Sequence, residues 1–325
     1  METINMSRNF GHNYVRLNGS NMNNNLNSDI NKVKENKKKI VKGIINVIKS
    51  INSNTEMNKN LKKMAFNQYL ISAVKYSLPR TVKYLLERGA DPNTLDNKGE
   101  NLLLMALYED NNIAKLLIEY GADVNKGTKM GFTPLEFALI RRKNFDMASL
   151  LIDKGADINK GLFGFGLVSK ASTLGDVNIL KFLDKKKKIN FNKALDRHGY
   201  APIHSAAKSG KKNAVKFLIE KGVDINKPTK YGSTPLQLAL SRGNMNMANF
   251  LIEHGANIHK KNKGFSIIHW AAFKGNKNIM EYLLDKGANI NNVGRGLSPL
   301  AIALIKNKKN IVNLLEKRRA VYRAP

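Results

Sequence analysis

The stretch GSTPLQLALSRG, residues 232–243, decides the fold of this chain. A glycine comes first, a Thr-Pro pair follows, and a short apolar run with small residues leads to a second glycine. Threonine is a favourable helix N-cap and proline suits the first helical position, so a short helix is predicted to begin after Thr234. The same pattern returns at 131–140, 199–210 and 264–275. The chain therefore consists of repeated helical units.

Two series of glycines give the length of the repeated unit. GAD-like turns begin at Gly89, Gly121, Gly155, Gly222, Gly255 and Gly287. The wide gap before Gly222 is two periods with one marker missing. The second series comprises Gly99, Gly131, Gly164, Gly199, Gly232, Gly264 and Gly296. Both series have a period of about 33 residues, which is typical of stacked helix pairs.

A second apolar run follows each of these stretches, for example AVKFLIEKGVDIN at 214–226. With this paired pattern, the chain resembles the ankyrin repeat family over about residues 63–325. The resemblance implies an all-α ankyrin-repeat solenoid of about seven or eight helix-turn-helix repeats, joined by hairpin-like loops. A single unit cannot bury its apolar face, so neighbouring units are expected to stack.

The repeats and the composition divide the chain into three parts. Residues 1–32 are rich in Asn and are expected to be a disordered leader. Residues 33–62 are expected to form a basic amphipathic helix that caps the first repeat, and the repeat domain occupies 63–325. Within this domain, 163–196 is a degenerate repeat and 295–325 is a C-terminal cap.

The helix predicted near the N-terminus has one apolar face. That face comprises Ile40, Val41, Ile44, Ile45 and Ile48. Gly43 weakens the helix by about 1 kcal/mol compared with alanine. Because lysines surround the apolar face, a membrane-surface helix and a partner-docking helix are alternatives to the cap.

The composition excludes several classes of protein. The chain of 325 residues has no cysteine, which excludes disulfides and thiol catalysis. No apolar run approaches the roughly 20 residues of a membrane span, and the first residues lack the apolar core of a secretory signal. We therefore expect a cytoplasmic protein, with an organelle or a host cell as the alternatives.

Positive charge is the other strong signal. The chain has 55 Lys and Arg against 25 Asp and Glu, for a net charge of +30. Residues 1–60 contribute only 10 basic and 4 acidic residues, so most of the excess belongs to the repeats. Such a field attracts acidic proteins, nucleic acids and other polyanions.

No group of residues has the convergence that catalysis needs. His204 and His269 stand at the histidine of the family's TPLH motif, and the resemblance implies that they brace neighbouring repeats. His254 and His259 flank a turn and lack further metal ligands. The glycine-rich stretch 161–166 lacks the Lys-Ser/Thr pair of a phosphate-binding loop. We therefore expect neither an enzyme nor a cofactor or metal site.

The family's usual binding surface is formed by the loops at the second glycine series and by the exposed part of each first helix, along a concave face. Carried onto this chain, that surface is basic and aromatic, with hardly an acid. Its expected partner-binding residues are Phe132, Arg141, Phe163, Phe165, Arg197, His198, Tyr200, Lys208, Lys230, Tyr231, Arg242, Lys263, Phe265, Phe273, Lys274 and Arg295. The Phe side chains can instead fold inward onto the neighbouring loop.

Interleaved cations and aromatic rings suit two kinds of partner. They bury the apolar anchors of a protein with an acidic rim, or they stack bases while neutralising phosphates. We favour a non-catalytic protein-interaction scaffold for an acidic or mixed protein partner, and expect a monomer outside its complexes. A nucleic-acid-binding or ribonucleoprotein assembly subunit is the alternative. A host-directed effector of an intracellular parasite or virus is compatible with either.

Four consecutive lysines stand where the missing GAD-like glycine belongs. Segment 181–190 aligns with 216–226 but is one residue shorter, so Lys186 or Lys187 is expected to replace the glycine. A lysine in a left-handed turn costs about 1 kcal/mol compared with glycine. We predict an irregular turn, a break in the stack, and a hinge between repeats one to three and five to eight. A nuclear address and an anion patch of Lys185, Lys186, Lys187 and Lys188 are the alternatives.

Overall fold

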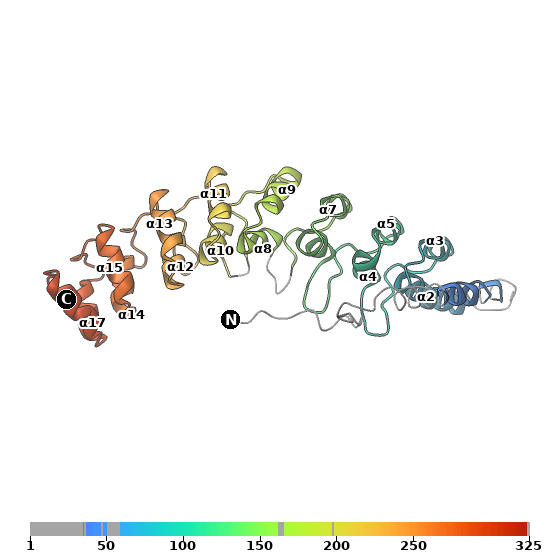
Figure 1. Cartoon of the computed structure of the whole chain (residues 1–325), viewed down its shortest axis with the longest axis horizontal. Helices are drawn as coiled ribbons and strands as arrows, with labels where there is room; N and C mark the ends of the chain where they lie inside the picture. The colour runs from blue at the N-terminus through green and yellow to red at the C-terminus, as the bar shows by residue number, and fades with distance from the viewer. Residues whose placement is uncertain are drawn as a thin grey trace, which may run out of the picture. The chain divides into compact units, whose positions relative to one another are not determined.

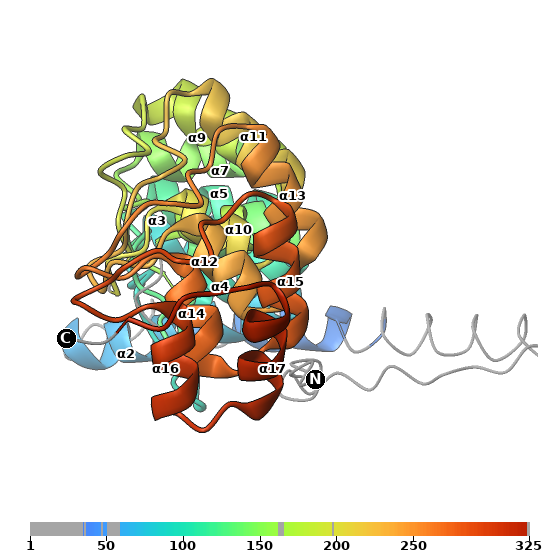
Figure 2. The ribbon, with the colours of Figure 1, turned by 90° about the vertical axis from the view of Figure 1, so that its left-hand side faces the viewer.

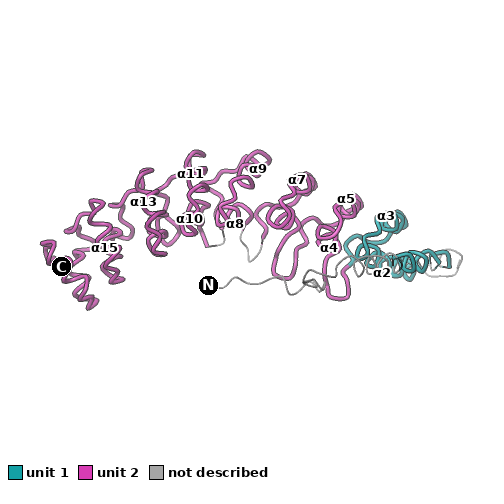
Figure 3. Tube along the Cα trace, viewed as in Figure 1, with its two compact units in different colours: residues 1–94 teal, residues 95–325 magenta. Residues whose placement is uncertain are grey.

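A computed structural model describes residues 35, 37–46, 48–50, 59–161, 166–196 and 198–323 (Figure 1). The predicted leader, residues 1–32, lies outside the described residues. By its internal packing the chain divides into two compact units, residues 1–94 and residues 95–325 (Figure 3).

Unit 1 contains one complete helix pair and a further helical stretch. Residues 37–46 and 48–50 are helical, and they precede α2 (Lys59–Lys75) and α3 (Pro79–Glu87), which pack together. Ile44 and Ile48 are buried, whereas Ile45 is 45% exposed. The buried face of the stretch is therefore narrower than the predicted one.

Unit 2 continues the same pattern of short helix pairs. In each pair we call the helix that follows the loop the first helix and its partner the second helix. The first helices are α4 (Leu102–Glu109), α6 (Pro134–Glu136) with η2 (Phe137–Arg141), α8 (Leu167–Leu174), α10 (Pro202–Lys208), α12 (Pro235–Ser241), α14 (Ile267–Lys274) and α16 (Pro299–Ile305). The second helices are α5 (Asn111–Glu119), α7 (Phe145–Asp153), α9 (Val177–Lys187), α11 (Lys212–Glu220), α13 (Met245–Glu253), α15 (Lys277–Asp285) and α17 (Lys309–Lys317).

The described residues thus hold eight helix pairs, and the predicted all-α architecture is confirmed. The first helices begin as the sequence predicted. The Thr234 hydroxyl accepts a hydrogen bond from the Gln237 N–H, and the Gln237 side chain accepts one from the Thr234 N–H. Thr133 and Glu136 form the same capping box in the third repeat. In each capping box, two backbone N–H groups that have no partner within the helix donate to side chains. This favours a defined start of the helix.

The first helix of the third repeat contains an irregularity that was not predicted. Eleven positions separate the caps Thr133 and Asn144, whereas ten separate Thr234 and Asn244. The additional residue is accommodated by the π-helical segment η2, in which the Arg142 N–H donates to the Phe137 carbonyl. A single-residue insertion in a helix commonly produces such a π-bulge.

Side-chain bridges and close helix packing join successive repeats of unit 2. The first helices α8, α10 and α12 pack in series, and α14 packs against α16. The Asn226 amide donates to the Gly255 carbonyl at 3.1 Å and accepts from the Asn257 N–H at 2.7 Å, one repeat further on. In the turned view the long loops of this unit gather on one side of the helix rows (Figure 2).

The four lysines adopt a different arrangement from the predicted one. Helix α9 extends through Lys187, and Lys188 takes the left-handed conformation with φ of 47°. The prediction that Lys186 or Lys187 would replace the glycine is therefore wrong, because the helix is longer than its counterparts. The predicted break in the stack is not found between the fourth and fifth repeats. Helices α8 and α9 pack on α10 and α11, and the Ser169 and Ser205 hydroxyl oxygens lie 3.1 Å apart.

Candidate interaction surface

The loops between repeats that the structure describes in full form short hairpins, which we call the finger loops. Three of them contain Lys230, Lys263 and Arg295, which we call the basic finger set. In the loop around Lys263, the N–H groups and carbonyls of Asn262 and Phe265 exchange hydrogen bonds across a two-residue turn. Lys263 itself has φ of 47°, and Arg295 has φ of 50° in the equivalent turn. Both cations therefore stand at the tips of tight hairpins.

Basic side chains in two finger loops lie over glycines of the preceding loop. A Cβ atom placed on Gly199 would lie 3.1 Å from the Cδ atom of Lys230. A Cβ atom placed on Gly264 would lie 2.9 Å from the Cγ atom of Arg295. The missing side chains leave room for the aliphatic stems of these cations, and both residues are exposed. In each residue the aliphatic stem packs against the preceding loop while the charged group stays in solvent, an arrangement known as snorkelling.

Several cations lie over aromatic rings of the same surface. The Lys230 Nζ is 5.0 Å from the ring centroid of Tyr231, whose side chain is 60% exposed. The Lys208 Nζ is 5.3 Å from the ring centroid of Tyr200. Such pairs contribute about 0.5–1 kcal/mol at exposed sites and fix the cation beside the ring.

The predicted partner-binding residues fall into three groups. Exposed ones are Arg141, His198, Lys230, Tyr231, Arg242, Lys263, Phe273, Lys274 and Arg295. Half-buried ones are Phe132, Tyr200, Lys208 and Phe265. Phe163, Phe165 and Arg197 lie outside the described residues. The exposed group comes from finger loops and first-helix ends, which are the elements that the prediction named.

The half-buried aromatic rings pack partly onto their own repeats. The Phe132 ring makes an edge contact with Phe137, with centroids 6.3 Å apart. The Phe265 ring makes an edge contact with His269 at 5.5 Å. These contacts are with the first helix of the same repeat, whereas the alternative prediction placed the rings on the neighbouring loop. The exposed rings of Tyr231 and Phe273 are therefore the better candidates for contact with a partner.

Charge is segregated between the two kinds of helix. The first helices α8, α10, α12, α14 and α16 contain no Asp or Glu. Acidic residues occur instead on the second helices, for example Asp184 on α9 and Glu253 on α13. The Asp184 carboxylate forms an ion pair with the Lys221 Nζ atom at 2.6 Å. From α8 onward the first helices therefore contribute no negative charge, whereas the earlier α4 and α6 contain Glu109 and Glu136.

His204 and His269 are structural groups, as the family resemblance implied. The His204 Nδ1 accepts from the Ala201 N–H at 2.9 Å, so its Nε2 carries the proton and donates to the Lys227 carbonyl at 2.7 Å. His269 joins Ser266 to the Asn292 carbonyl in the same way. Burial lowers the pKa of both imidazoles below the ordinary value. Each ring therefore links a helix start to the following loop in its neutral form.

The lysine cluster is exposed but not free of partners. Lys185, Lys186, Lys187 and Lys188 are all exposed at the end of α9. The Lys186 Nζ lies 3.4 Å from a carboxylate oxygen of Asp153 in the preceding repeat. Lys187 and Lys188 also line a shallow recess of about 510 Å³ beside Asn159. An anion patch at this cluster stays a prediction.

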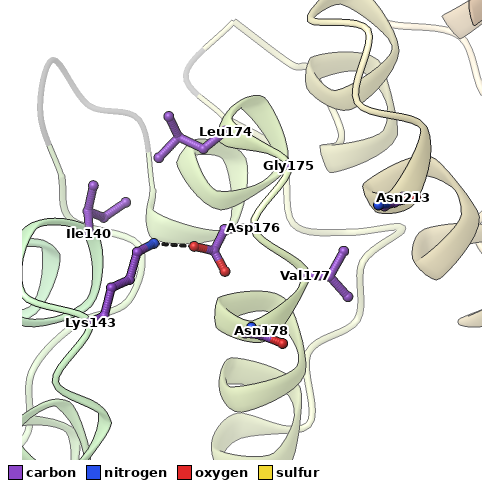
Figure 4. A pocket seen from close by; sticks show the side chains of 8 residues that line it. All are labelled: Ile140, Lys143, Leu174, Gly175, Asp176, Val177, Asn178 and Asn213. Carbon is purple, nitrogen blue, oxygen red and sulfur yellow. Dashed lines mark hydrogen bonds and ion pairs between the residues drawn. The ribbon is translucent and has the colours of Figure 1, made fainter.

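A second recess, of about 600 Å³, opens where three repeats meet near the starts of their second helices (Figure 4). Ile140, Leu174 and Val177 line it, and an ion pair between Lys143 and Asp176 crosses it. Burial alone would raise the pKa of Asp176, but hydrogen bonds from Lys143 and the Ile179 N–H lower it below its usual value. The ion pair already satisfies the charged groups, so the recess offers little for a charged ligand.

This repeated architecture identifies the family. A family model described as "Ankyrin repeats (3 copies)" matches residues 70–161, 168–262 and 257–323. The chain belongs to the ankyrin repeat family. Ankyrin repeats are protein-interaction modules, and the family is generally not enzymatic. Within the described residues, no helix has the length and apolar character needed to cross a membrane.

Similar proteins share only part of the chain. A putative ankyrin repeat protein of Rickettsia felis is 33% identical over 92 residues, which is 26% of this chain and 40% of that protein. A putative ankyrin repeat protein of Acanthamoeba polyphaga mimivirus, L38, is 35% identical over 87 residues, 26% of this chain and 45% of its own length. Glycerophosphocholine phosphodiesterase gde1 of Schizosaccharomyces pombe is 34% identical over 86 residues, 26% of this chain and 8% of its length. The chain thus matches less than half of each relative.

Three exposed or cationic side chains of this surface were not predicted. Arg142 lies over the ring of Tyr108, with its Cζ atom 5.0 Å from the centroid. Ile305 and Lys306 end the first helix of the last repeat described and are exposed. Both follow Ser298 at the distances by which Phe273 and Lys274 follow Ser266. That alignment was the available signal for Ile305 and Lys306.

Proposed function

We propose that this chain is a non-catalytic scaffold that binds an acidic or mixed-charge protein partner. The finger loops and the exposed ends of the first helices form the binding surface, along the concave face of the solenoid. In this proposal the chain acts in the cytoplasm and is a monomer outside its complexes.

The observation that supports this proposal is the segregation of charge. The surface presents the basic finger set and the first-helix cations Arg242 and Lys274, while five successive first helices lack acids. A surface of one sign accelerates association with a partner of opposite sign and selects against like-charged partners. The exposed rings of Tyr231 and Phe273 supply apolar contact area among the cations.

Matched charge reversals test this surface. The chain is cleared of nucleic acid with nuclease and high salt, its captured partner is identified by mass spectrometry, and the affinity is then measured with purified proteins. We expect the triple variant K230E/K263E/R295E to weaken binding at least about tenfold, since each desolvated cation contributes to the complex. The control K181E/K216E/K317E changes net charge equally on second helices α9, α11 and α17. Equal losses in both triples would show that the finger loops are not the binding surface.

A nucleic acid is the second candidate partner. The Lys230 ammonium lies over the exposed Tyr231 ring, so a cation for a phosphate stands close to an aromatic ring on which a base could stack from the opposite face. A protein with 6–10 phosphate contacts loses about a thousandfold or more in affinity between 50 and 200 mM salt. Titration of labelled single-stranded RNA and duplex DNA at these two salt concentrations tests it. No binding at the lower concentration would exclude this candidate.

A further inference from the structure

Two neighbouring first helices leave apolar side chains exposed beside lysines. Helix α14 carries Phe273, which is 48% exposed, and α16 carries Ile305, which is 61% exposed. Each lies seven residues after its helix cap, Ser266 or Ser298, so they occupy equivalent positions on adjacent repeats. Because α14 and α16 pack against each other, the two side chains belong to one surface.

Trp270 and two cations extend this surface. Trp270 is half-buried and precedes Phe273 by three residues on α14, which places both on one helix face. The Lys306 Nζ, from the following repeat, is 5.1 Å from the Phe273 ring centroid, and the Lys274 Nζ is 5.8 Å from it. We call Trp270, Phe273, Lys274, Ile305 and Lys306 the α14–α16 patch.

The surroundings of the patch are free of acids along the sequence. No Asp or Glu occurs in residues 254–280 or 286–315. The intervening Glu281 and Asp285 lie on the second helix α15, where Glu281 is ion-paired with Lys277 at 3.8 Å and Asp285 with Arg318 at 3.5 Å. The lysines of the patch therefore have carboxylate partners neither on α14 nor on α16. Their positive charge is available to a partner.

The geometry favours a protein segment over a nucleic acid. Two ammonium groups already lie over the Phe273 ring, which leaves less of its face for stacking on a base. Ile305 has no aromatic face with which a base could stack. An aliphatic or aromatic side chain can pack against Ile305 and the ring edge, while carboxylates on either side of it meet the lysines.

We propose that the α14–α16 patch is the apolar docking centre for an acidic amphipathic segment of a protein partner. The segment inserts an apolar side chain between Phe273 and Ile305, and its flanking carboxylates bind Lys274 and Lys306. This inference rests on the proposed scaffold function and names the part of its surface that contributes most to affinity.

Two synthetic helical peptides of about 18 residues test it with the full chain. One has Leu at i, i+3, i+4 and i+7 among Glu residues; the other has Ser at each Leu position and the same charge. Fluorescence anisotropy gives their affinities at 50 and 200 mM salt. The leucine peptide is expected to bind at least about tenfold tighter, because only it buries apolar side chains. Equal binding of the two peptides would overturn the proposal.

Variants locate the peptide. Phe273→Ala and Ile305→Ser are each expected to weaken binding of the leucine peptide about tenfold, whereas Tyr120→Ala, an exposed ring at the end of the second helix α5, changes it less than about threefold. Lys306→Glu is expected to weaken it more than Lys216→Glu, an equal charge change on the exposed side of α11. Circular dichroism checks that each variant stays folded. No loss with Phe273→Ala and Ile305→Ser would overturn the proposal.

The same titrations separate this inference from the scaffold function. Loss of peptide binding with K230E/K263E/R295E, but not with the patch variants, would refute the patch and leave the proposed surface intact. No effect of either set would contradict both. Tighter binding of single-stranded RNA, phosphatidylserine vesicles or a second copy of the chain, lost with Phe273→Ala, would assign the patch to that occupant instead.

Discussion

Lys188 adopts a backbone conformation in which most repeats of this chain have glycine. Its φ of 47° places it in the left-handed region, where a Cβ atom clashes with the backbone. Lys188→Gly is expected to raise the free energy of unfolding by about 1 kcal/mol. Urea denaturation followed by circular dichroism measures the change. Lys185→Gly, inside α9, is the control and is expected to lower it by about 1 kcal/mol. A destabilising Lys188→Gly would contradict this assignment of strain.

The neutral histidines predict a pH dependence. The pKa of His204 and of His269 is lowered on folding, so the unfolded chain binds more protons below the ordinary pKa of about 6.5. Their contribution to stability is complete above that pH and is lost as the pH falls toward 5. Gln237 caps its helix from the same position, so His204→Gln with His269→Gln keeps both helix starts. The double variant should lose less stability than the wild type between pH 7 and pH 5, and equal losses would contradict the prediction.

The sequence predicted the conformation of a residue well where its type and its neighbours fit only one structural role. Thr133 and Thr234 cap helices because a hydroxyl followed by proline suits little else. It failed at the lysine cluster, since four identical side chains give no sign of which one ends the helix. The inward packing of Phe132 and Phe265 was equally undetermined, because both burial and exposure of an aromatic ring at a loop are favourable.

At the scale of elements, one inter-repeat bridge is missing where the sequence departs from its own pattern. Asn226 joins its turn to the next through two hydrogen bonds, and His259 stands at the equivalent position one repeat later without such bonds. His259→Asn is expected to add them to Gly287 and Asn289 and to stabilise the chain by about 1 kcal/mol, measured by urea denaturation. Asn226→Ala removes the two hydrogen bonds of the existing bridge and should lower the free energy of unfolding by about 1–3 kcal/mol. An unchanged midpoint for His259→Asn would show that the turns cannot meet.

The period of the glycines was sufficient to predict helix pairs, their order and their loops. It was insufficient for η2, because an inserted residue can lengthen a loop, shift a cap or widen a helix at similar cost. The structure selects the widened helix, since Asn144 keeps its hydrogen bond to the Met147 N–H. Lys143 then takes the left-handed position before the cap, with φ of 54°.

At the scale of unit 2, two junctions differ from the others. The backbones of α12 and α14 approach less closely than those of α10 and α12 or of α14 and α16, and the pair η2 and α8 behaves likewise. These are also the junctions at His259 and Asn159, where the described residues form no asparagine bridge to the following turn. The recess of about 510 Å³ lies at the second of them. We therefore expect stronger coupling within each block of repeats, such as α8–α13 or α14–α17, than across the junctions that bound these blocks.

Hydrogen exchange measures this coupling. We expect amides of α14–α17 to exchange through an opening that leaves α8–α13 protected, because the interface between the blocks contributes less stability. His259→Asn should raise the protection of α14–α17 toward that of α8–α13, which ordinary fraying of a chain end would not do. A single common exchange free energy, unchanged in the variant, would contradict the division into blocks.

The cations that lie over glycines have a thermodynamic consequence for any partner. A free lysine or arginine side chain loses about 1.5–2 kcal/mol of rotamer entropy when it is immobilised. The stems of Lys230 and Arg295 already lie against Gly199 and Gly264, so part of that loss occurs during folding and not during association. Their ammonium and guanidinium groups are thereby preorganised, and a complex formed there retains more of its interaction energy as affinity. Replacing Gly199 or Gly264 by a larger residue would displace the aliphatic stem of the cation. The charge would remain, but the charged group would be less fixed in position.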